Sequence, residues 1–77
     1  SLTVHFQSFL EAEITRRKVL PGLGPAGVHK EFTVNRTNLI IRLMADDWNL
    51  LQIATVTIVA QLYLVVRAMG QSWPSIR

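Results

Sequence analysis

The sequence predicts an all-α protein in which a single transmembrane helix follows an amphipathic N-terminal helix, a Pro/Gly connector and a short interfacial helix. The first observation is the uncharged stretch from Trp48 to Val66, in which ten side chains are Leu, Ile or Val. As a helix this stretch is roughly 28 Å long, close to the ~30 Å hydrocarbon core of a bilayer. The second is helical spacing of apolar residues near the N-terminus. The third is that the remaining chain is too short to bury an independent globular core.

The boundaries of the expected span, residues 48–69, are polar or aromatic. Asp46 and Asp47 precede it and are expected to cap its first turn, where carboxylates accept hydrogen bonds from free N–H groups. Trp48, Arg67 and Trp73 are expected to anchor the helix at the two interfaces. The alternative is a buried helix of a soluble domain, which is disfavoured because such a helix normally presents a charged stripe to water.

Small and amide side chains within the span predict protein neighbours. At 100° per residue, one face of the helix collects four of them: Ala54, Thr57, Gln61 and Ala68. Such residues permit close approach and hydrogen bonding between helices, so this face is expected to pack against other spans. The alternative is that isolated Thr and Gln residues are simply tolerated in lipid.

Residues 1–20 are expected to form the amphipathic extramembrane helix. Its docking face would consist of four apolar residues at helical spacing: Phe6, Phe9, Leu10 and Ile14. Glu13 can pair with Arg17 one turn later, and a basic cluster at 16–18 suits the C-terminal end of the helix. This face would lie on a partner or in the membrane interface; the alternative is an ordinary helix with a solvated charge cluster.

The connector is assigned to residues 21–35 and contains two motifs of low specificity. Gly22, Gly24 and Gly27 match G-x-G-x-x-G, but no strand precedes them, so a dinucleotide site is rejected. A glycosylation sequon at 35–37 is short enough to occur by chance. Residues 32–34 are consistent with a short extended piece. The interfacial segment is assigned to 36–47, and the C-terminal tail to 70–77.

No catalytic constellation is evident, and the chain is predicted not to be an enzyme. It has no cysteine, and His5 and His29 are isolated. We expect no cofactor or metal of its own, although lipid contacts are expected and Gln61, Gln52 or Asn49 could ligate a pigment magnesium. The arm before the span carries six basic and five acidic residues, so nucleic acid is not expected as a partner.

These features predict a non-catalytic accessory subunit of an energy-transducing membrane complex. The favoured location is the mitochondrial inner membrane, in an electron-transport assembly, with thylakoid or bacterial inner membrane as alternatives. Its partners would be integral membrane subunits and lipids, and its role would be assembly and stability. Basic residues before the span favour an N-terminus inside. The alternatives are a reversible one-span regulator of a transporter or pump, and a small soluble helical domain.

Overall fold

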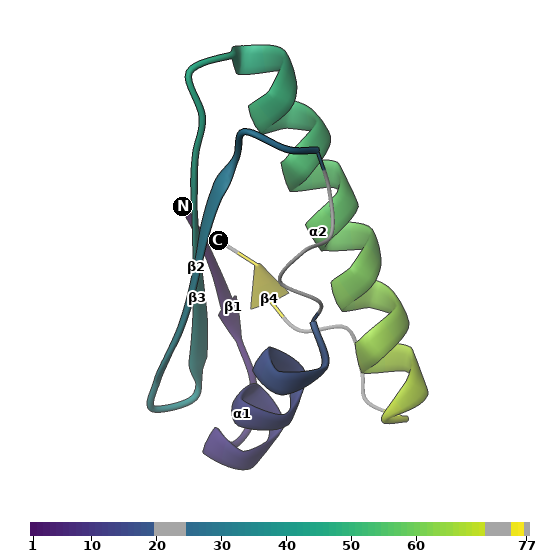
Figure 1. Ribbon diagram of the computed structural model, residues 1–77. Coiled ribbons are helices and arrows are strands. Elements are labelled where there is room, and N and C mark those ends of the chain that lie inside the picture. Colours follow the sequence, from purple (N-terminus) through teal and green to yellow (C-terminus); the bar gives the residue numbers. More distant parts are fainter. Residues whose placement is uncertain (20–24, 71–74, 77) are drawn as a thin grey trace.

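The computed structural model describes residues 1–19, 25–70 and 75–76 and contains both strands and helices (Figure 1). In these residues the elements are β1 (Leu2–His5), α1 (Phe9–Lys18), β2 (His29–Asn35), β3 (Asn38–Met44), α2 (Trp48–Ala68) and β4 (Ser75–Ile76). The fold is therefore α+β, and the expected all-α class is wrong. Both helices lie on the same face of one antiparallel sheet, and the described residues place no helix on its other face (Figure 1).

The order of strands in the sheet is β2-β3-β1-β4. β2 and β3 form a hairpin whose pairing runs from His29 opposite Met44 to Asn35 opposite Asn38. β1 lies on the other side of β3, antiparallel to it, with Leu2 opposite Ile41. α1 therefore connects two parallel strands that are separated by β3. Short β4 pairs with the outer side of β1.

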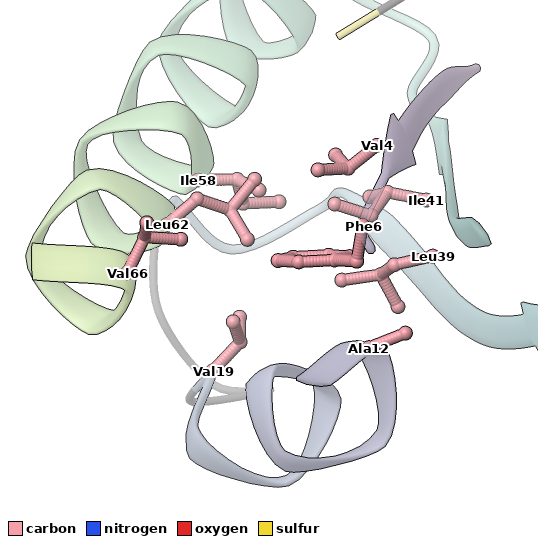
Figure 2. Packing of buried hydrophobic residues seen from close by; sticks show 9 residues of the cluster. All are labelled: Val4, Phe6, Ala12, Val19, Leu39, Ile41, Ile58, Leu62 and Val66. Atoms are coloured by element: carbon pink, nitrogen blue, oxygen red, sulfur yellow. The ribbon is translucent and has the colours of Figure 1, made fainter. Parts of the chain in front are cut away.

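The core lies between the sheet and the helices, and alternation along each strand selects its residues. The inner face of the sheet carries Leu2, Val4, Leu39, Ile41, Leu43, Phe32 and Val34. Phe6 follows β1 and is also buried, with Ala12 and Val19 of the α1 region below it (Figure 2). From the opposite side, α2 inserts Ile58, Leu62 and Val66 into the same cluster (Figure 2).

The N-terminal region is a strand followed by a ten-residue helix, and not the single helix expected over residues 1–20. α1 begins after Ser8, whose Oγ accepts a hydrogen bond from the Glu11 N–H at 3.2 Å. This is an ordinary serine N-cap. The spacing of Leu2, Val4 and Phe6 is the period of a strand, which is why this segment is extended.

The middle of the chain is a β-hairpin where a connector and an interfacial helix were expected. β2 contains the extended piece expected at residues 32–34, and β3 occupies most of the segment assigned to the membrane interface. Leu39, Ile41 and Leu43 alternate with residues on the other face of β3, so their side chains enter the protein core and not a bilayer. The turn residue Arg36 has a φ of 58°, in the left-handed region.

α2 spans all but one residue of the segment expected to be a membrane helix. One of its sides packs against the protein core, where lipid and other spans were expected. Five of its residues are buried against the rest of the protein: Ala54, Ile58, Leu62, Val65 and Val66. Within the described residues α2 is long and apolar enough to cross a bilayer by length and composition. A core helix satisfies the same test, and here one side of α2 is part of the core.

Truncation of Leu39 tests the assigned inner face of the sheet. Leu39 is fully buried, so Leu39→Ala should lower the free energy of unfolding by about 2–5 kcal/mol. The neighbouring Ile40 points to the opposite face and is half-buried, so Ile40→Ala should cost clearly less. Urea denaturation of both variants measures the difference. Equal losses would contradict the assigned strand register.

Replacement of Arg36 tests the turn. A non-glycine residue at positive φ is strained, so Arg36→Gly should raise the free energy of unfolding by about 0.5–1 kcal/mol. Arg42→Gly is the matched control, because Arg42 lies inside β3, where glycine is unfavourable and should lower stability. Thermal unfolding distinguishes the two, and a destabilised Arg36→Gly variant would refute the strained turn.

Candidate interaction surface on the second helix

The two ends of α2 are fixed by local hydrogen bonds. Asp47 is the N-cap, and its Oδ1 accepts a hydrogen bond from the Asn49 N–H at 2.8 Å. Asp46 is exposed beside it. At the other end, Gly70 has a φ of 71°, a conformation that favours glycine after a helix. The structure thus places Asp47, one of the two expected caps, at the start of the helix.

The threonines of α2 do not interrupt its apolar surface. The Thr55 hydroxyl donates to the carbonyl oxygen of Leu51 at 2.8 Å, and the Thr57 hydroxyl donates to that of Ile53 at 2.7 Å. Both hydroxyl donors are therefore satisfied within the helix. This leaves a surface whose chemistry is set by its aliphatic side chains.

One side of α2 exposes large apolar residues to solvent. Ile53 is 52% exposed, Val56 is 69% exposed and Leu64 is 58% exposed. Ala60 is exposed between them. We call these four residues the outer face of α2. At 100° per residue they lie on the side opposite the core residues. Contiguous exposed apolar residues of this kind mark interaction sites.

Next to the outer face, an open groove of about 550 Å³ follows the N-terminal half of α2. Its lining residues are Trp48, Leu51, Gln52, Thr55 and Val56. A second hollow of about 200 Å³ lies between α2 and the sheet and shares Leu51 and Thr55 with the first. The groove is mainly apolar, with Trp48 exposed at its acidic end.

The four residues expected to pack against neighbouring helices lie on a flank of α2. Ala54 is buried, Thr57 and Gln61 are half-buried and Ala68 is exposed. This flank turns from the core toward the surface and is less exposed than the outer face. Sequence reasoning missed the outer face itself, although the signal was present: its apolar residues recur at intervals of three and four.

The expected interface anchors lie at opposite ends of α2. Trp48 is 68% exposed at the first turn, and Arg67 is exposed in the last turn. Trp73 lies outside the described residues. The polar and aromatic character of these two residues does not require a membrane interface, because both ends of the helix lie at the protein surface.

The expected docking face of the N-terminal segment is divided by the structure. Phe6 is buried in the core, whereas Phe9 is 56% exposed and Leu10 is 65% exposed. Ile14 is half-buried. The four residues therefore do not form one exposed face. Phe9 and Leu10 remain as an apolar pair at the start of α1.

The basic cluster of α1 is partly neutralised within the helix. The Glu13 carboxylate accepts hydrogen bonds from Arg16 and, at 3.3 Å, from Nε of Arg17. The hydrogen bond from Arg16 lowers the pKa of Glu13 below its ordinary value, and the nearby Arg17 adds to this effect. The same pairing raises the pKa of Arg16. α1 is thus less basic on its surface than its sequence indicates.

Polar side chains on the strands form isolated pairs. Nδ1 of His5 lies 2.6 Å from Oδ1 of Asn38, and Nε2 of His29 lies 3.0 Å from a carboxylate oxygen of Glu31. Among the described residues there is no group of three or more His, Cys, Asp or Glu side chains that could hold a metal ion.

Comparison with known proteins gives one family. Residues 1–70 match the model of a family described as "Transcription factor Pcc1". No match to the chain is found among curated proteins. The matched range includes β1 to β3 and both helices, so the outer face of α2 lies within it.

This match, together with the α+β fold, corrects the membrane interpretation. The prediction of an integral membrane protein is wrong, and so is the predicted mitochondrial or thylakoid location. The predicted role in electron transport and the predicted integral membrane partners are also wrong. The accessory role in an energy-transducing membrane complex is wrong with them. The prediction that nucleic acid is not a partner is also withdrawn, because the description of the family names a transcription factor. The error arose because α2 is apolar on both its buried side and its outer side.

The pairing of Glu13 predicts a dependence of stability on pH. Because the pKa of Glu13 is lowered in the folded state, its stabilising effect is present above the ordinary value of 4.5 and is lost as the pH falls through the lowered value. Glu13→Gln should therefore unfold more easily than the parent chain at pH 7, and the difference should be smaller at pH 3. Urea denaturation at both pH values checks this. An equal difference at both would assign the effect to packing.

Proposed function

Because the chain belongs to the Pcc1 family, we propose that it is a non-catalytic subunit of a soluble multi-subunit complex of the KEOPS type. Its role is to bind neighbouring subunits, and the outer face of α2 is its docking surface. The absence of cysteine from the sequence and the isolated polar pairs of the sheet suit a binding role better than a catalytic one. A small α+β protein of this kind acts by holding other subunits in position.

The observation that carries this proposal is the exposure of the outer face. Val56 and Leu64 are each more than half exposed, on the side of the helix that faces away from the sheet. Contiguous apolar side chains that are exposed in this way are unfavourable in water, and soluble proteins usually cover such a surface with a partner. The bare face of the sheet is more polar, with Thr33, Glu31 and Arg42 exposed, so it is the weaker candidate.

The spacing along α2 favours a helix as the docked element. Exposed or half-exposed positions recur at intervals of four and three residues: Asn49, Ile53, Val56, Ala60, Tyr63 and Arg67. This spacing is the one found in coiled-coil-type contacts, in which two helices cross at roughly 20°. Ala60 lies in the middle of the seam, where a small residue lets the two helices approach closely.

Substitution within the outer face tests the proposal. Val56→Asp places a charge at the centre of the expected contact, and the cost of burying an unpaired carboxylate there should weaken binding about tenfold or more. The folded chain should keep its stability, because Val56 is exposed and Asp has a helix propensity close to that of Val. A tagged chain isolated from its own cells should then lose its companion subunits, as judged by size separation and mass spectrometry.

Thr33→Asp is the matched control, because it adds the same charge to the exposed face of the sheet. It should leave the complex intact. The proposal is wrong if Val56→Asp assembles like the parent chain, or if Thr33→Asp disrupts the complex equally. Thermal unfolding of both purified variants separates loss of contact from loss of fold.

A further inference from the structure

The strands at the two sides of the sheet differ in how well their side chains protect an edge. β2, at one edge, carries Lys30 on the same side as the partly buried Phe32 and Val34. An inward-pointing charge on an edge strand opposes pairing with a strand of another chain, because such pairing would bury the charge. β1, on the opposite side of β3, contains no Lys, Arg, Asp, Glu or Pro. The side chains of β1 therefore give it no such protection.

β4 supplies the protection that β1 lacks. It lies along the outer side of β1, antiparallel to it, with Ile76 opposite Val4 and Ser75 opposite His5 (Figure 1). Without a neighbouring strand, the backbone N–H and C=O groups on this side of β1 would point to solvent and could pair with an extended segment of another chain. β4 blocks such pairing along the second half of β1. Among the described residues, the first two residues of β1 have no strand partner on this side.

The contact between β4 and β1 is short. β4 contains two residues, so it forms few backbone hydrogen bonds, and the entropy lost when the segment becomes ordered offsets most of their gain. The pairing of β1 with β3, by contrast, extends along the whole of β1. β4 can therefore detach while the rest of the sheet stays paired, and the edge of β1 is then uncovered in a fraction of the molecules.

We propose that β4 is an autoinhibitory cover of the β1 edge. While β4 is paired, β1 of a second copy of the chain cannot add to the sheet. When β4 is detached, the β1 edges of two copies pair antiparallel about a twofold axis, and each satisfies the free N–H and C=O groups of the other. The cover thus holds the free chain in a monomeric state. This inference does not depend on the outer face of α2.

A disulfide between β1 and β4 tests the closed form. His5 and Ser75 lie directly opposite each other on adjacent antiparallel strands, a separation that a disulfide can bridge. Because the sequence contains no cysteine, His5→Cys/Ser75→Cys gives one defined bond. The reduced form of the same variant is the control, because it carries the same substitutions and can still open. Every variant also carries Val56→Asp, which opposes self-association through the outer face of α2.

Proline substitution tests the open form. Proline has no N–H to donate to β1 and is excluded from the interior of paired strands, so Ser75→Pro/Ile76→Pro should keep β4 detached. Ser75→Ala/Ile76→Ala is the matched control, because alanine removes the same two side chains and keeps both N–H groups. The full chain is used in each case.

Sedimentation velocity over a range of protein concentrations measures self-association. The double-proline variant should form dimers at a concentration roughly tenfold or more below that of the double-alanine variant, because the apparent affinity rises with the fraction of molecules whose edge is uncovered. The oxidised disulfide variant should remain monomeric where its reduced form begins to dimerise. In the dimer of the double-proline variant, the backbone amides of β1 should exchange their hydrogens more slowly than in its monomer.

Each comparison can overturn the proposal. A double-proline variant that stays as monomeric as the double-alanine variant would show that β4 does not restrain the edge. Equal self-association of the oxidised and reduced forms, or failure of the two cysteines to join within one chain, would show that β4 does not cover β1. A dimer with unchanged exchange in β1 would place the contact elsewhere. Thermal unfolding verifies that folded chains are compared, and the disulfide comparison decides the matter if the proline variant does not fold.

Discussion

The contact between α2 and the middle of the sheet holds this small protein together. Ile58, Leu62 and Val66 meet Val4 and the inner residues of β3 in one cluster, and the region of α1 closes the cluster from below (Figure 2). A chain of 77 residues has little other apolar surface to bury, so its stability depends on this single layer between helices and sheet. The position of α2, and with it the outer face, follows from the same contact.

A helix with two apolar sides explains how a protein of this fold resembles a membrane protein in its sequence. The inner side of α2 belongs to the core, and its outer side is exposed to solvent. Water reaches the outer side in the isolated chain, so the hydrophobicity has a cost in solubility that a bound partner would remove. Length and composition alone do not distinguish a bilayer from two protein surfaces.

Parts of the fold could be predicted from local patterns, and parts could not. The extent of α2 and its acidic start followed from the apolar stretch and from Asp46 and Asp47. β1 was missed because Phe6 and Phe9 have helical spacing, although Leu2, Val4 and Phe6 also alternate. β3 was missed because Ile40 and Ile41 are both apolar, which hides the alternation. The outer face required knowledge of which side of α2 the sheet covers, and this is set by residues more than ten positions away.

The position of β3 between β1 and β2 also has a kinetic consequence. The hairpin of β2 and β3 pairs residues close in sequence and can form early, whereas His5 must find Asn38, 33 positions later in the chain. During synthesis, β1 and α1 leave the ribosome before β3, the strand that pairs with β1. The N-terminal segment therefore waits with Val4 and Phe6 uncovered, a period in which a chaperone or a partner subunit could engage it.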